Sequence, residues 1–166
     1  INEPPPGVDL TGEDISFNES LYRRMGSSYP INYTLLNGGN LDYTGGTAIT
    51  VRYFLSLNDI ISPLDIPLGD ININEALPKK SRLENRETTI SIPEGIETGA
   101  YYLAMLIDKD ETLDETDETN NTILSNNKYF VIEKESDVPH FAFATGTGGK
   151  YSLSINGFSA VNEELA

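Results

Sequence analysis

Apolar and polar residues alternate along several short stretches of the chain, which is typical of β-strands with one buried face. The alternation is clearest where Ile31, Tyr33 and Leu35 share one face. It recurs over residues 49–55 and 99–108, whose apolar members on one face are Ile49, Val51, Tyr53, Leu55, Tyr101, Leu103, Met105 and Ile107. The pattern predicts that these side chains fill a common core.

Weaker patterns add strands at 8–17, 70–74, 88–92 and 128–132, and residues 58–70 are predicted to form a loop. Turn residues separate the strands, as in the Asn-Gly-Gly-Asn run over 37–40. Residues 18–30 are predicted to form a connection with room for a short additional pairing. No helical periodicity is present. The sequence therefore predicts an all-β fold, a two-sheet sandwich of about seven strands.

The two ends of the chain differ from this domain. Residues 1–7 are rich in proline and predict an extended linker that spaces modules. Beyond the sandwich domain of residues 8–133, a charged break precedes an apolar stretch at 140–144, a glycine-rich turn at 146–149 and a strand at 151–155. Residues 134–166 are thus predicted to be a C-terminal β-hairpin extension or the start of a further module. We interpret the chain as a piece of a longer protein.

Composition narrows the classes of partner. A formal net charge of -15 and a pI near 4.2 argue against nucleic acids and anionic membranes, which are bound by clustered Lys and Arg. No apolar run approaches the roughly 18 residues of a membrane span. The absence of Cys excludes disulfides and thiolate metal sites.

An acidic stretch follows the most apolar segment of the chain. Seven carboxylates lie between residues 108 and 118, at positions 108, 110, 111, 114, 115, 117 and 118. Two such charges ~5 Å apart repel by about 0.8 kcal/mol even in water. A Ca²⁺ ion would remove that repulsion, since it takes oxygen ligands from carboxylates and carbonyls. The candidate calcium ligands are Asp108, Asp110 and Glu115.

The spacing of these residues is not that of an EF-hand. Leu113 occupies the position that requires Gly, and Thr119 the position that requires a bidentate Glu. Two interpretations therefore stay open. Either a looser calcium site forms, or the carboxylates are solvated while Glu115, Asn120 and Asn121 bond to backbone groups and fix the turn.

The other polar and aromatic residues give weaker evidence for a functional site than the acidic stretch does. A second acidic series of Asp59, Asp65 and Asp70 is interpreted as a set of turn formers. His140 is the sole histidine, so neither a catalytic triad nor a zinc site is predicted. Acidic pairs in an exposed turn lack the buried cleft that glycoside hydrolysis requires. Tyr residues outside the core pattern are interpreted as scattered surface side chains, although a planar row would stack on sugar rings: Tyr22, Tyr29, Tyr43 and Tyr102.

Several motifs carry a family resemblance. They include the Tyr-Thr-Leu-Leu-Asn-Gly-Gly run over 33–39, the Arg-Tyr-Phe-Leu-Ser-Leu-Asn-Asp run over 52–59, and the Gly-Ala-Tyr-Tyr-Leu run over 99–103. Asp108, Asp110, Glu115, Glu118 and the Asn120-Asn121 pair follow in the same order. From residue 8 to about 133 the chain resembles the CARDB family, the cell-adhesion-related domain found in bacteria. The resemblance implies an immunoglobulin-like β-sandwich that is one module of a large secreted or surface-anchored protein, with no established catalytic residues.

The functional expectation follows from the resemblance and the absence of a catalytic constellation. We expect a non-catalytic extracellular or cell-surface module, not an enzyme, that acts in adhesion or as a spacer, with calcium as the candidate cofactor. Its expected partners are the other modules of the parent protein and a cell-surface protein or glycan. The alternative is a carbohydrate-binding accessory module of a secreted hydrolase.

Overall fold

The computed structural model describes residues 5–18, 20–133, 144–145, 151–155 and 158–162. The chain divides into two compact units, Ile1–Glu133 and Lys134–Ala166. Among the residues that the structure describes, no helix has the length and apolar character needed to cross a membrane.

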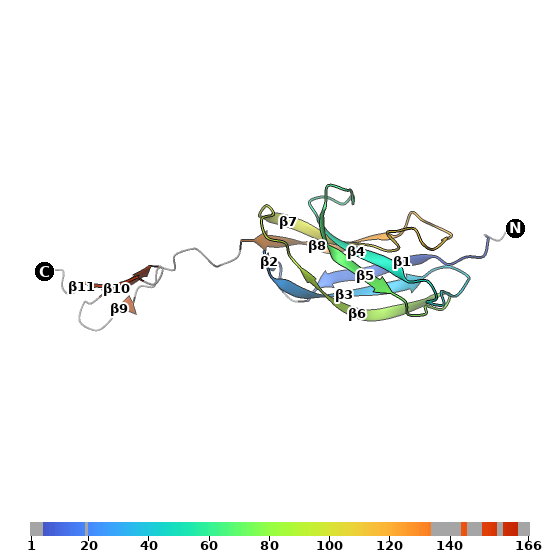
Figure 1. The fold of residues 1–166 in the computed structure, drawn as a ribbon, viewed down its shortest axis with the longest axis horizontal. Coiled ribbons are helices and arrows are strands. Elements are labelled where there is room, and N and C mark those ends of the chain that lie inside the picture. The colour runs from blue at the N-terminus through green and yellow to red at the C-terminus, as the bar shows by residue number, and fades with distance from the viewer. Residues whose placement is uncertain (1–4, 19, 134–143, 146–150, 156–157, 163–166) are drawn as a thin grey trace. The chain divides into compact units, whose positions relative to one another are not determined.

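The first unit is a sandwich of two β-sheets (Figure 1). The smaller sheet has the order β1-β3-β6, formed by β1 (Leu10–Phe17), β3 (Ser28–Asn37) and β6 (Ser81–Ser91). The larger sheet has the order β2-β8-β7-β4-β5, formed by β2 (Tyr22–Arg24), β8 (Thr122–Ile132), β7 (Gly99–Leu106), β4 (Ile49–Ser56) and β5 (Ile66–Ile73). All strand pairs are antiparallel except β2 and β8, which are parallel. The predicted all-β sandwich is confirmed. It has eight strands where about seven were predicted, because the short pairing expected within residues 18–30 forms β2.

The core lies between the inner faces of the two sheets. Every apolar residue that the alternation assigned to it is buried, and several expose none of their surface, among them Ile31, Val51, Tyr53, Leu103 and Met105. Alternating residues share a face because successive side chains of a strand point to opposite sides of the sheet. The predicted core is therefore confirmed.

Four strands begin earlier than their apolar pattern indicated. β3 starts at Ser28, within the predicted connection, and β5 starts at Ile66, within the predicted loop. β6 starts at Ser81, and β8 starts at Thr122. Their first residues pair with neighbouring strands, for example Thr122 with Leu106. Backbone pairing sets these boundaries, and the polar side chains at the strand ends carry no alternation that reveals it.

Tyr43 corrects the interpretation of the tyrosines outside the core pattern. It exposes only 4% of its surface. Its hydroxyl oxygen lies 2.5 Å from the carbonyl oxygen of Thr47 and 3.0 Å from that of Ile73, so its single proton is shared between these two acceptors. Tyr43 forms an isolated bridge with Leu77 and lies outside any regular strand. The alternation of buried and exposed residues along a strand therefore does not predict its burial. Tyr22, in contrast, is exposed as expected.

A buried cation that the sequence did not predict lies at the β2 end of the core. Arg23 exposes only 2% of its surface. Three aromatic rings surround its guanidinium carbon, with centroids at 4.3, 4.8 and 5.4 Å, from Phe17, Tyr29 and Tyr129. Its Nη1 atom donates to the carbonyls of Ser20 (2.7 Å) and Tyr22 (2.6 Å). Arg23 thus joins the β1–β2 connection to the core.

The described part of the second unit is a small sheet with the order β11-β10-β9. β9 (Ala144–Thr145) pairs antiparallel with β10 (Tyr151–Ile155), and the residues between them lie outside the described part of the chain. β11 (Phe158–Asn162) adds a strand that was not predicted. The rest of the predicted first strand, residues 140–143 with His140, lies outside the described residues.

Candidate functional site

The acidic loop, residues 107–121, connects β7 to β8 at the end of the sandwich where β1 begins (Figure 1). Ile107 N donates to the carbonyl of Asn121 at 2.9 Å and closes the base of the loop. Asp108 and Glu111 have positive φ angles of 47° and 49°. Asp tolerates this left-handed conformation better than most residues do. The loop therefore turns sharply just after the core strand ends.

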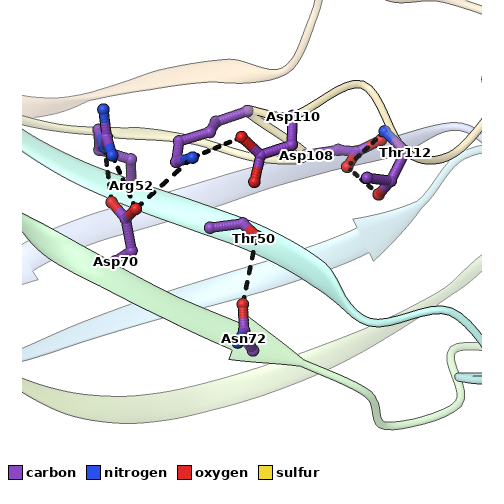
Figure 2. A network of polar contacts seen from close by, with 8 residues as sticks. Thr50, Arg52, Asp70, Asn72, Asp108, Asp110 and Thr112 are labelled. Carbon is purple, nitrogen blue, oxygen red and sulfur yellow. Dashed lines mark hydrogen bonds and ion pairs between the residues drawn. The ribbon is translucent and has the colours of Figure 1, made fainter.

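Asp108 is buried and organises the first turn of the loop. It exposes 2% of its surface. Its Oδ1 accepts hydrogen bonds from Thr112 N (3.2 Å) and Thr112 Oγ1 (2.8 Å), and its Oδ2 accepts one from Leu113 N at 2.8 Å. Figure 2 shows Asp108 directed at Thr112. Both carboxylate oxygens thus bind donors of the loop itself.

Asp110 belongs to a network on the surface of the larger sheet (Figure 2). Its Oδ1 lies 2.5 Å from Lys109 Nζ, which also lies 3.6 Å from Asp70 Oδ2. Asp70 in turn accepts two hydrogen bonds from Arg52, at 2.6 and 2.8 Å. The hydrogen bond from Arg52 is the main cause that holds the pKa of Asp70 below its usual value. This network attaches the start of the loop to β4 and β5.

Glu115 reaches out of the loop to the N-terminal strand. Its Oε1 accepts a hydrogen bond from Leu10 N, and its Oε2 accepts one from Asn121 Nδ2 at 2.8 Å. Val8 and Glu115 also form an isolated parallel bridge. Burial raises the pKa of Glu115 to about 7, although the hydrogen bonds from Leu10 and Asn121 oppose the rise.

Further hydrogen bonds join the loop to residues 8–11. Thr116 N donates to the carbonyl of Val8 at 2.8 Å. Asn120 Nδ2 donates to Asp9 Oδ1 at 2.8 Å, and Thr11 Oγ1 donates to the carbonyl of Asn120 at 2.9 Å. We call this set the N-terminal clamp: Glu115, Thr116 and Asn120 of the loop with residues 8–11. It connects segments that are about 110 residues apart in the chain.

The structure does not bring the three candidate calcium ligands together. Asp108 binds the first turn of the loop, Asp110 lies in the surface network, and Glu115 binds Leu10. Within the described residues, no group of three or more His, Cys, Asp or Glu side chains is placed to hold a metal ion. In this geometry Asp108, Asp110 and Glu115 do not fit a shared ion. Calcium at the acidic loop stays a prediction from the sequence.

A profile of the CARDB family matches residues 8–125, more than half of the chain. The chain belongs to the CARDB family. A search of the curated proteins finds no significant match to this CARDB domain.

Two solved structures show the fold of the CARDB domain. One is a CARDB domain from Pyrococcus furiosus in complex with di-metal ions, with 16% identity and a TM-score of 0.51 over 80% of this chain and 95% of that one. The other is a domain of a Methanosarcina acetivorans protein assigned to the cell surface, with 16% identity and a TM-score of 0.51 over 78% of this chain and 96% of that one. They confirm the immunoglobulin-like sandwich.

The second acidic series of the CARDB domain has separate structural roles. Asp65 Oδ2 accepts a hydrogen bond from Ser62 N at 2.6 Å, as expected of a turn former. Asp70 lies on β5 and pairs with Arg52. Asp59 is exposed in the β4–β5 loop.

Sequence reasoning missed the role of Asn37. It exposes only 1% of its surface. Its Oδ1 accepts hydrogen bonds from Asp9 N (3.3 Å) and Gly39 N (3.0 Å), and its Nδ2 donates to the carbonyls of Leu41 (2.9 Å) and Leu77 (3.0 Å). The Asn-Gly-Gly run indicated only a turn, whereas the side chain bonds to four backbone groups, those of residues 9, 39, 41 and 77. It supports the N-terminal clamp from the other side of Asp9.

The titration of Glu115 gives a pH-dependent stability. Because burial raises the pKa of Glu115 in the folded protein to about 7 from its ordinary value of 4.5, its contribution to stability is fully present below pH 4.5 and is lost as the pH rises through 7. The nearby charges of Glu118 and Asp108 act in the same direction as burial. Relative to Glu115→Gln, we expect the wild type to lose about 2 kcal/mol between pH 5 and 8, after allowance for solvent screening.

Urea unfolding of both proteins at several pH values measures this effect. Gln keeps an acceptor for Leu10 N, and Asn121 Oδ1, which is buried and has no hydrogen-bond partner among the described residues, becomes available to its amide if the Asn121 side chain turns. A constant difference between the two proteins across this range contradicts the prediction.

Proposed function

We propose that this CARDB domain is a non-catalytic module of a larger cell-surface protein, which spaces or presents other modules and takes part in adhesion. The observation that carries the proposal is the position of the two ends of the sandwich. The chain joins β1 at one end, and β8 finishes at the opposite end (Figure 1). A module with this geometry extends a chain of modules lengthwise.

Both ends of the sandwich are held by hydrogen bonds to segments from elsewhere in the chain. At the first end, the N-terminal clamp binds residues 8–11. At the other end, Met25 N donates to the carbonyl of Ile132 at 3.0 Å, and β2 pairs with the last three residues of β8. Tension between residues 8 and 132 would therefore load β1 and β8 along their length, so that several hydrogen bonds must break together.

Family membership and the surface assignment of the Methanosarcina relative support an extracellular location. The partners that this role requires are the other modules of the parent protein. The large negative charge is consistent with a surface protein that stays apart from nucleic acid.

Single-molecule pulling through the two ends of the sandwich tests the spacer role. We expect one cooperative unfolding event with a length gain of about 400 Å, since roughly 125 residues extend at ~3.4 Å each. Glu115→Ala should lower the unfolding force because it removes the bond to Leu10 N. The control Glu84→Ala, in an exposed residue of β6, should leave it unchanged. Gradual extension with no discrete event contradicts a tension-bearing spacer.

A carbohydrate-binding accessory module is the second candidate. The observation that favours it is an exposed aromatic pair on the larger sheet, where Tyr22 and Phe130 stack at 5.6 Å and expose 60% and 45% of their surfaces. Such rings are suitable for contact with sugars. Binding on a glycan array that Tyr22→Ala abolishes would support this candidate, and an array without signal would eliminate it.

Calcium stiffening of the acidic loop is a separate proposal for the same module. It is supported by the carboxylate density of the loop and by the di-metal complex of the Pyrococcus relative. Asp108 and Glu115 already accept hydrogen bonds from the chain, so an ion would have to compete with those donors. Amide hydrogen exchange of the loop with calcium and with EDTA separates a loop held by its own hydrogen bonds from one that requires the ion.

A further inference from the structure

The β4–β5 loop, residues 57–65, holds three large apolar side chains in solvent. Leu57, Ile60 and Leu64 expose 58%, 70% and 94% of their surfaces. The loop stands out from the sandwich in Figure 1, between the ends of β4 and β5. Single exposed apolar residues are ordinary, whereas three within eight positions of one loop are the kind of feature from which interaction surfaces are built.

Side chains of the loop fix its own turns. Asn58 Oδ1 accepts a hydrogen bond from Ile60 N at 2.8 Å. Asp65 Oδ2 accepts one from Ser62 N at 2.6 Å, and Asp65 N donates to the carbonyl of Ser62 at 3.1 Å. These bonds are typical of rigid turns. Ile60 is therefore held outward by a defined backbone.

The neighbouring strand β8 anchors the start of the loop. Lys128 Nζ donates to the carbonyl of Leu57 at 2.6 Å and lies 4.6 Å from the ring centroid of Tyr102. A loop fixed from within and from the sheet loses little conformational entropy when a partner binds. The exposed side chains are thus presented in advance of binding, as in a recognition loop.

A pocket of about 520 Å³ opens beside the loop. This volume is within the range of ligand-binding pockets. Leu57, Leu64 and Ile96 contribute apolar surface to it, while Asp65 and Glu97 contribute acidic groups. The described residues that line it include no Lys or Arg. The pocket therefore favours an apolar group that is accompanied by positive charge.

We propose that loop 57–65 and this pocket form a docking surface for a segment of another protein, one that offers an apolar side chain flanked by Lys or Arg. The apolar side chain enters the pocket, and the basic residues face Asp59, Asp65 and Glu97. Charge argues against a second copy of this chain, because two molecules with a net charge of -15 repel each other. The surface adds a binding role that does not depend on the spacer role.

A displayed library of random peptides, selected on the full chain, tests the proposal. We expect the enriched peptides to share an apolar residue next to Lys or Arg. Binding of a synthesised consensus peptide, measured by calorimetry, should weaken by about tenfold or more in Ile60→Ser and Leu64→Ser, as for central interface residues. It should also weaken when NaCl is raised from ~50 to ~500 mM, since salt screens the attraction.

Leu41→Ser is the control, because Leu41 is also an exposed leucine, with 48% of its surface in solvent, and lies in a different loop. It should leave peptide binding unchanged, and thermal unfolding should show that all three variants fold as the wild type does. Three results would overturn the proposal: no enriched peptide, peptides without basic residues, or peptides that bind Ile60→Ser and Leu64→Ser as well as they bind the wild type. Loss of the spacer behaviour in pulling experiments would leave this test unaffected.

Discussion

Replacing Arg23 with Ala should lower the free energy of unfolding by about 4 kcal/mol. The substitution empties the space between Phe17, Tyr29 and Tyr129 and removes the donors that the carbonyls of Ser20 and Tyr22 accept from. Loss of a large buried side chain and of charge-assisted hydrogen bonds each costs a few kcal/mol. Urea unfolding followed by tyrosine fluorescence measures the change.

Two further variants identify the cause of the loss. Arg23→Met fills much of the space but donates no hydrogen bond, so we expect an intermediate loss of about 2 kcal/mol. Arg82→Ala is the control, since Arg82 is exposed and lies 3.5 and 3.7 Å from Glu13 and Glu84 in surface ion pairs. Its loss should stay within about 0.5 kcal/mol. Equal losses in Arg23→Ala and Arg82→Ala would contradict a structural role for the buried guanidinium.

Replacing Asp108 with Ala should lower the free energy of unfolding by about 3 kcal/mol. The partly buried amides of Thr112 and Leu113 lose their acceptor, which costs about 1–3 kcal/mol. In addition, Ala is strained at the positive φ angle of 47°, by roughly 1 kcal/mol. The same urea unfolding measures the sum.

Asp108→Asn separates the two contributions. Asn tolerates a positive φ and keeps one acceptor oxygen, so it should lose less than Ala does. Asp110→Ala is the control in the same loop, because Asp110 is about half exposed and bonds to Lys109 on the surface. We expect its effect to stay below about 1 kcal/mol. If Asp110→Ala lowered the free energy of unfolding as much as Asp108→Ala does, the burial of Asp108 would not explain its contribution to stability.

The sequence predicted the sandwich because its core is encoded locally. Alternation at period two places Ile31, Tyr33 and Leu35 on one face whatever the rest of the chain does, and all three are buried. The ends of the strands were harder to predict from the sequence, since Ser81 and Thr122 belong to strands only because they pair with distant residues. The missing information was long-range hydrogen bonding.

The polar interior could not be predicted in the same way. Arg23 follows an exposed Tyr22 in a segment that reads as a loop, and only the packing of three distant rings makes it a buried residue. Asn37 read as a turn residue, but its side chain bonds depend on where residues 9, 41 and 77 lie in space. Such roles depend on tertiary contacts that no local pattern encodes.

The acidic loop also depends on contacts with residues that are distant in the chain. Its composition indicated oxygen ligands for a cation, and the alternative that Glu115, Asn120 and Asn121 fix the turn was also drawn from the residue types. The structure pairs Glu115 with Leu10, 105 residues away, and Asn120 with Asp9, 111 residues away. The spacing of carboxylates along the chain does not reveal such partners. Their identification required the three-dimensional structure.

Amide hydrogen exchange in the full chain, with EDTA and with calcium, tests most directly whether the protein's own hydrogen bonds hold the acidic loop without an ion. The amides of Leu10, Leu113 and Thr116 donate to Glu115, Asp108 and Val8 respectively. We expect all three to be as protected in EDTA as amides of the β1–β3 pairing, because their acceptors belong to the chain. Rapid exchange of these amides in EDTA, with protection restored only by calcium, would contradict the account.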